Sequence, residues 1–210
     1  KGGNAIDAAV AVGFALAVTS SGNGNIGGGG FLVARMANGA SFTLDHREAA
    51  PKKSKRDMFL TSDGDVIPGM SLGTRASSGV PGTVDGLLRV FYDYGSGSVS
   101  LRDVLLPAIK LAEKGFKLSF YEANRFNNYR ELFERNKAAS DIFIRKDKKE
   151  WKKGDLLIQK DLANTLKRIL KFGRDGFYSG KTAELIIKEM IRGNGLISNE
   201  DLKDYTSVYR

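Results

Sequence analysis

The sequence contains no cysteine and a single histidine, His46, among its 210 residues. The absence of cysteine excludes a disulfide framework, a thiolate zinc site and a cysteine nucleophile. With one imidazole, no second histidine is present to share a metal ion, and we expect neither a metal nor a cofactor. Any hydrolytic chemistry must therefore use hydroxyl, carboxylate, lysine, arginine or backbone groups.

Long hydrophobic runs are also missing. The most apolar segment, Ala5 to Val18, contains Asp7, and at about fourteen residues it falls short of the roughly twenty that a bilayer requires. Only Lys1 precedes it as a charged residue, which does not match a signal peptide. We therefore expect no membrane span in this chain.

Glycine and charge are distributed unevenly along the chain. Residues 1–100 hold 18 of the 25 glycines and 9 basic against 8 acidic residues, whereas residues 101–210 hold 24 basic against 16 acidic residues. Hydrophobic residues are 41% and charged residues 27% of the total, an ordinary globular composition. We predict a glycine-rich α/β part over residues 1–98 and a mainly helical part over residues 99–210.

Local patterns predict the elements of the first part. Asn4 is a favourable N-cap for a buried, alanine-rich helix over Ala5–Val18. Two strands, Phe31–Met36 and Ser41–Asp45, flank the turn dipeptide Asn38-Gly39, which is typical of a β-hairpin. The first part is therefore predicted to run helix, glycine loop, hairpin.

The second part is predicted to be helical. Ser100 with Asp103 forms an N-cap pair, and Pro107 is expected to break or restart the helix that follows. Residues 121–136 are predicted to form one amphipathic helix. Apolar residues at helical spacing indicate further helices over residues 84–91, 162–170, 179–193 and from Ser198 onward.

Two glycine motifs precede the hairpin. Gly22–Gly27 matches GxGxxG, but dinucleotide binding requires a strand before the loop and a helix after it, and here the order is reversed. The run Gly27–Gly30 costs conformational entropy, so it favours a tight passage of the backbone from helix to strand under a packed layer.

A charged cluster closes the second predicted strand. It comprises Asp45, His46, Arg47 and Glu48. Arg47 has the planar donors to hold a substrate carboxylate, but composition alone favours an ion pair with Asp45 or Glu48. A lone histidine without a matched nucleophile favours a structural or surface position for His46.

The densest basic stretch, Arg145–Lys153, includes Trp151. Basic residues interleaved with an aromatic side chain are found in nucleic-acid sites. Asp147, Glu150 and Asp155 interrupt the stretch, so a solvated loop is favoured and we expect no nucleic-acid partner.

A series of strings, in order along the whole chain, resembles the γ-glutamyltranspeptidase family. They are KGGNAIDAAVAVG (1–13), GNIGGGGF (24–31), LDHREAAP (44–51), RDMF (56–59), SGVPGTVDGL (78–87), LLPAIKLAEKGF (105–116), KKGDLLIQKDLANTL (152–166), FYSGKTAELI (177–186) and GNGLISNEDLKDY (193–205).

The resemblance implies an α/β (α+β) fold, the αββα sandwich of N-terminal nucleophile hydrolases. It further implies a precursor that cuts itself into a large and a small subunit, with the N-terminal threonine of the small subunit as nucleophile. That threonine would attack the γ-glutamyl amide of glutathione or a related compound, and water, an amino acid or a peptide would accept the acyl group. This chain resembles part of the large subunit and is expected to need the small subunit as its partner.

The resemblance implies one substrate-binding residue here. Arg47, in the LDHRE string, matches the arginine that holds the substrate α-carboxylate, which reverses the preference for a simple ion pair. Asp45 and Glu48 are expected to support it. The family often has an aromatic residue where His46 stands. No catalytic residue is expected in this chain, because no threonine matches the nucleophile motif, and the isolated chain should be inactive.

Two alternatives stay open at this point. One is a glutaryl or cephalosporin acylase of the same family, and the other is an inactive homologue that binds an acidic partner through the basic stretch. The resemblance also implies a periplasmic, secreted or otherwise extracellular location.

Overall fold

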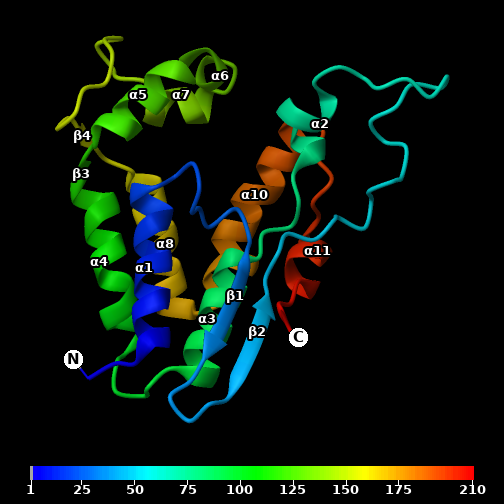
Figure 1. Cartoon of the computed structure of the whole chain (residues 1–210). Coiled ribbons are helices and arrows are strands. Elements are labelled where there is room, and N and C mark those ends of the chain that lie inside the picture. Colours follow the sequence, from blue (N-terminus) through cyan, green and yellow to red (C-terminus); the bar gives the residue numbers. More distant parts are fainter. Residues whose placement is uncertain (1) are drawn as a thin grey trace.

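The computed structural model describes residues 2–210, and Figure 1 shows their arrangement. Helix α1 (Ala5–Thr19) leads through a glycine-rich loop into the antiparallel hairpin β1 (Phe31–Arg35) and β2 (Ser41–Asp45). The register pairs Phe31 with Asp45 and Arg35 with Ser41. Near the other end of the chain, β5 (Val208–Tyr209) adds antiparallel to β2, so the sheet order is β1-β2-β5. The predicted helix and hairpin are confirmed.

Helix α1 begins with the expected cap. The Asn4 side chain accepts from the backbone N–H groups of Ile6 and Asp7, and Asp7 accepts from the Asn4 N–H. One face of the helix, with Val10 and Phe14, is fully buried. The predicted burial of this helix therefore applies to one face, whereas Val12 on another face is 55% exposed.

A layer of helices carries the core. Helices α1, α4 (Leu101–Lys114) and α8 (Lys160–Phe172) lie side by side, and α3 (Thr83–Tyr94) packs between α1 and the sheet. A single buried cluster includes residues from both predicted parts of the chain, from Ile6 to Tyr205. The division near residue 98 stays a prediction.

The prediction that Pro107 breaks or restarts the helix is wrong. The helix is continuous from Leu101 to Lys114, with Pro107 inside it. Pro107 is exposed, whereas Val104, Leu105 and Ala108 on the opposite side are buried. Packing of that buried face outweighs the backbone hydrogen bond that proline cannot donate.

A small lobe follows α4. It contains β3 (Phe116–Lys117), α5 (Phe120–Asn128), α6 (Arg130–Glu134), α7 (Lys137–Phe143) and β4 (Leu156–Leu157). The predicted single helix over residues 121–136 is therefore wrong, because the helix is interrupted at Tyr129, between α5 and α6. A second apolar cluster packs Phe126 against the rings of Phe133, Phe143 and Trp151.

The basic stretch is a surface loop of this lobe. Arg145 forms ion pairs with Asp147 and Asp155, and its guanidinium carbon lies 5.6 Å from the centroid of the Trp151 ring. The interrupting acidic residues therefore neutralise part of the stretch.

The remaining elements complete the far side of the molecule. They are α2 (Met70–Gly73), a short 3₁₀ helix (Arg75–Ser77), α9 (Asp175–Tyr178), α10 (Gly180–Arg192) and α11 (Asn199–Asp204). Part of the segment between β2 and α2 forms an arm that extends away from the sheet (Figure 1). No helix among residues 2–210 combines the length and apolar character needed to cross a bilayer.

A buried carboxylate joins α3 to the C-terminal segment. Asp85, 6% exposed, pairs with Arg174 Nε at 2.6 Å. Its other oxygen accepts from the Ser207 N–H at 2.8 Å and from the Ser207 hydroxyl at 2.7 Å. Because Ser207 directly precedes β5, this network fixes the strand that borders β2.

The glycine loop, residues 20–30, comes closest to the backbone at the end of β2 at Gly29. A Cβ at Gly29 would lie 2.5 Å from the His46 carbonyl oxygen and 2.7 Å from the Glu48 nitrogen, both backbone atoms. A Cβ at Gly28 would meet only side-chain ends, at 3.3 Å from Asn25 Oδ1 and 3.4 Å from Glu48 Oε1. The glycine run therefore permits one close backbone contact with the end of β2.

Replacing Asp85 with Asn should lower the free energy of unfolding by about 1.5–3 kcal/mol, because Arg174 loses a charged hydrogen-bond partner. Asp93→Asn is the matched control, since Asp93 is an exposed partner of Arg89 and Tyr209 and should cost about 0–1 kcal/mol. Urea unfolding of both variants measures the difference. Equal losses would contradict a structural role for the buried network.

Gly29→Ala should destabilise the protein by about 1–3 kcal/mol, the usual cost of overpacking. Gly28→Ala should be neutral within about 0.5 kcal/mol, because flexible side-chain ends can move away. The comparison by urea unfolding controls for the loss of glycine entropy, which both changes share. Equal stability of the two variants would show that the contact at Gly29 is not a constraint.

Candidate functional site

The charged cluster lies where β2 ends, in a segment we call the strand-end segment (His46–Glu48). Its backbone continues the hairpin pairing, since the His46 N–H donates to the Gly30 carbonyl at 2.9 Å and the Gly30 N–H donates to the His46 carbonyl at 3.2 Å. Just beyond, Ala49 and Val80 exchange backbone hydrogen bonds of 3.2 and 2.7 Å. The segment is therefore bonded on both flanks.

Gly82, just before α3, and Tyr205, just after α11, pack against the same backbone. A Cβ at Gly82 would overlap the His46 carbonyl oxygen and the Tyr205 hydroxyl. The Tyr205 hydroxyl donates to the Arg47 carbonyl at 2.8 Å, and burial raises the pKa of Tyr205 to about 12. Tyr205 thus remains a neutral donor that holds the backbone of Arg47 in place.

The Arg47 side chain leaves this rigid backbone toward solvent. It is 62% exposed, and one terminal nitrogen, Nη1, lies 2.9 Å from Glu48 Oε2. A guanidinium carries five donors, so this single ion pair leaves donors available to a ligand. Glu48 contacts the guanidinium as the sequence predicts, whereas binding of substrate by Arg47 stays a prediction.

Asp45 acts on the backbone of Arg47 and not on its guanidinium. Asp45 Oδ1 accepts from the Arg47 N–H at 3.0 Å, and Oδ2 pairs with Arg210 at 2.9 Å. These hydrogen bonds, led by the one from the Arg47 N–H, lower the pKa of the Asp45 carboxyl. Because the folded-state pKa is depressed, this contribution to stability is present above the ordinary pKa and is lost as the pH falls through the folded value.

His46 is buried, at 8% exposed. A Cβ at Gly86 would overlap its side chain, and a Cβ at Gly30 would lie 3.1 Å from its Cε1 atom. The ring packs between the two glycines. Burial lowers the pKa of the imidazole, which favours its uncharged form. This matches the structural alternative for His46.

Sequence reasoning missed Tyr205, Gly82 and Gly86. The two glycines lie in the string SGVPGTVDGL, which can be read from the sequence, but the sequence does not predict that they contact His46. Tyr205 is 158 positions from Arg47, and no local pattern connects them. Among residues 2–210, no group of three or more His, Cys, Asp or Glu side chains is placed to hold a metal ion.

The arrangement suits recognition of an anion. An exposed guanidinium on a backbone fixed by hydrogen bonds can bind a carboxylate with two parallel N–H donors. The strand-end segment holds no hydroxyl, thiol or amine nucleophile, its one imidazole is enclosed, and its one carboxylate, Glu48, is paired with Arg47. The site can therefore bind and orient a carboxylate, and any covalent chemistry requires groups outside it.

Comparison with known proteins agrees with this fold. The family model described as Gamma-glutamyltranspeptidase matches residues 1–210. The glutathione hydrolase proenzyme of Escherichia coli is 44% identical over 210 residues, which cover all of this chain and 36% of that protein. The chain therefore spans about a third of that relative's length.

Solved structures give the same result. The Helicobacter pylori γ-glutamyltranspeptidase superposes with a TM-score of 0.96 at 46% identity, and the match covers all of this chain and 59% of that chain. A cephalosporin acylase from Bacillus halodurans superposes with a TM-score of 0.83 at 22% identity, over 99% of this chain and 39% of that one, a likeness of fold alone. The predicted fold class, that of N-terminal nucleophile hydrolases, is confirmed, and this chain belongs to the γ-glutamyltranspeptidase family.

Proposed function

We propose that the complete protein is a γ-glutamyltransferase and glutathione hydrolase, and that this chain is part of its large subunit. The observation that carries the proposal is the exposed guanidinium of Arg47 on a rigid strand end, within the LDHRE string of the family. Membership in the family and the names of the relatives support it. The substrate is a γ-glutamyl compound such as glutathione.

Arg47 binds the α-carboxylate of the γ-glutamyl group and so positions the scissile amide. Glu48 orients the guanidinium through its ion pair, and the Tyr205 and Asp45 side chains hold the backbone. The N-terminal threonine of the small subunit attacks the γ-carbonyl and releases the amine. Water, an amino acid or a peptide then accepts the acyl group.

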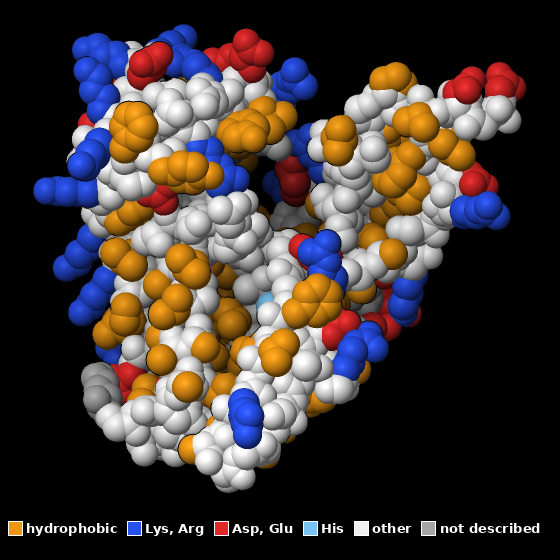
Figure 2. All heavy atoms as spheres, viewed as in Figure 1, with side chains coloured by type: hydrophobic (Ala, Val, Ile, Leu, Met, Phe, Trp, Pro, Cys, Tyr) orange, Lys and Arg blue, Asp and Glu red, His pale blue; other side chains and the backbone are white. Residues whose placement is uncertain are grey.

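The small subunit has a suitable place to pack. Val12 and Leu16 of α1 and Phe31 and Val33 of β1 are between 43% and 79% exposed, and Figure 2 shows apolar side chains over these two elements. Among residues 2–210, β1 pairs only with β2, so its other edge is open. Exposed apolar side chains beside an open strand edge favour a partner that covers both. We place the enzyme in the periplasm or outside the cell, in keeping with the family.

Arg47→Ala in the full-length protein should raise KM for γ-glutamyl-p-nitroanilide roughly ten- to hundredfold, because a charge-assisted contact contributes about 1.5–3 kcal/mol. Arg210→Ala is the control, since Arg210 pairs with Asp45 but does not contact Arg47's side chain. Release of p-nitroaniline measures KM, and intact mass verifies self-cleavage. An unchanged KM in a self-cleaved variant would remove Arg47 from the site. Self-cleavage without release from the wild type would favour the acylase alternative.

Tyr205→Phe removes the hydrogen bond to the Arg47 carbonyl and should cost about 0.5–1.5 kcal/mol of stability. Because the backbone of Arg47 then loses one restraint, KM for the same substrate should rise by less than in Arg47→Ala, with self-cleavage intact. Tyr209→Phe serves as control, since its hydroxyl donates to Asp93, remote from the strand-end segment. Identical KM values for both variants would show that Tyr205 does not position Arg47.

A further inference from the structure

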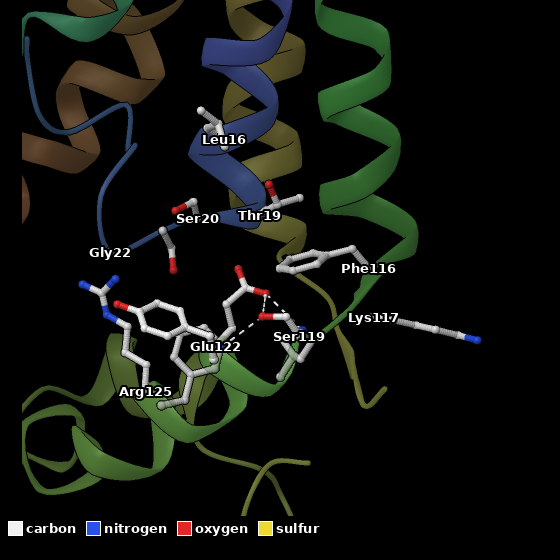
Figure 3. Close-up of a pocket in the computed structure, with 13 residues that line it drawn as sticks. Leu16, Thr19, Ser20, Gly22, Phe116, Lys117, Ser119, Glu122 and Arg125 are labelled. Carbon is white, nitrogen blue, oxygen red and sulfur yellow. Dashed lines mark hydrogen bonds between the residues drawn. The ribbon is translucent and has the colours of Figure 1, made fainter. Parts of the chain in front are cut away.

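A cavity of about 440 Å³ opens between the end of α1 and the start of α5. Residues 19–22 line one side, and residues 116–119 with one face of α5 line the other (Figure 3). Arg47 is not among its lining residues. The volume falls within the range of small-ligand sites.

Arg125 supplies a cation at one end of this cavity. Its guanidinium lies against Gly22, where a Cβ would overlap it, and Nη1 donates to Asn23 Oδ1 at 3.4 Å. Among residues 2–210 no carboxylate pairs with Arg125, whereas Arg75 and Arg174 each have one. Most of the donors of this guanidinium are therefore available.

Glu122 supplies an anion to the same cavity. Its carboxylate points into the space between α1 and α5 (Figure 3). Oε2 accepts from the Ser119 N–H at 3.1 Å and hydroxyl at 3.0 Å, while nothing among residues 2–210 donates to Oε1. Glu122 and Arg125 are three residues apart on one helix, yet they form no ion pair. The two opposite charges thus face the cavity separately.

Uncharged groups complete the lining. Ser20, next to the end of α1, is also among the lining residues. Leu16, Phe116 and Phe126 provide apolar surface. Lys117, in contrast, points away from the space (Figure 3), so it adds no second cation inside.

We propose that this cavity binds a free amino acid or dipeptide in its zwitterionic form. Arg125 binds the carboxylate through charge-assisted hydrogen bonds, and Glu122 Oε1 accepts from the ammonium group. Separated charges that do not neutralise each other complement a ligand whose own charges are held apart by its backbone. A doubly anionic or purely apolar ligand would leave one of the two side chains unpaired, which is costly.

The test uses the full-length protein with Arg47→Ala, so that binding at Arg47 does not contribute and no turnover is needed. Calorimetry measures binding of glycylglycine, of N-acetylglycylglycine, which lacks the ammonium, and of glycylglycine amide, which lacks the carboxylate. Glycylglycine should bind at least tenfold more tightly than either derivative. Absence of glycylglycine binding, or equal affinity for all three, would overturn the proposal.

Variants assign each charge to its side chain. Adding Arg125→Ala should weaken glycylglycine binding at least tenfold and abolish discrimination against the amide only. Adding Glu122→Gln, which keeps an acceptor for the Ser119 cap, should abolish discrimination against the N-acetyl derivative only. Lys117→Ala is the matched control and should leave all affinities unchanged. Parent-like affinities in Arg125→Ala, with thermal unfolding unaltered, would overturn the proposal. Because the readout is binding, this result is independent of γ-glutamyl transfer.

Discussion

The strand-end segment, His46–Glu48, depends on close contact between backbones. Gly29 and Gly30 of the glycine loop lie on one side of it, and Gly82 and Gly86 at the start of α3 lie on the other. Close approach of this kind requires residues without a Cβ, because a methyl group at Gly29 or Gly82 would overlap main-chain atoms and one at Gly86 would overlap the His46 side chain. The hydroxyl of Tyr205 adds a hydrogen bond to the Arg47 carbonyl. The exposed Arg47 side chain is thereby attached to a backbone that close contacts and hydrogen bonds hold in place.

Asp85 in the core and two arginines at the surface differ in how fully their side chains are paired. Asp85 is buried and has Arg174 and Ser207 as partners, in agreement with the high cost of an unpaired buried charge. Arg47 and Arg125 retain unused donors at or near the surface. A rigid network thus fixes the strands and helices, while two arginines remain able to bind ligands at different places in the fold.

In the proposed function, two polypeptides contribute residues to substrate binding and catalysis. This chain would supply the carboxylate-binding arginine and the framework behind it, and the small subunit would supply the nucleophile. The exposed apolar residues of α1 and β1 agree with that division, because exposed apolar surface is typical of sites where another protein surface packs. The composition is also consistent with it, since threonine chemistry requires neither cysteine nor a free histidine.

Features governed by neighbours in sequence could be predicted from the sequence. The Asn4, Ser100 and Ser198 caps, the Asn38-Gly39 hairpin and the apolar face of α8 depend on contacts three or four residues away, or on one turn, and all are present. The break at Tyr129 and the continuity of α4 through Pro107 were not predictable in this way, because packing against distant residues outweighed local preference.

The sequence by itself determined the family, the hairpin, most of the helices with several of their caps, and the candidate arginine. Only the tertiary structure decided how that arginine is held, that His46 is buried between two glycines, and that Arg125 and Glu122 face one cavity without pairing. The physical reason is that these relations join residues far apart in the chain, such as Arg47 and Tyr205. Their energies come from close packing and from hydrogen bonds that exist only once the chain has folded.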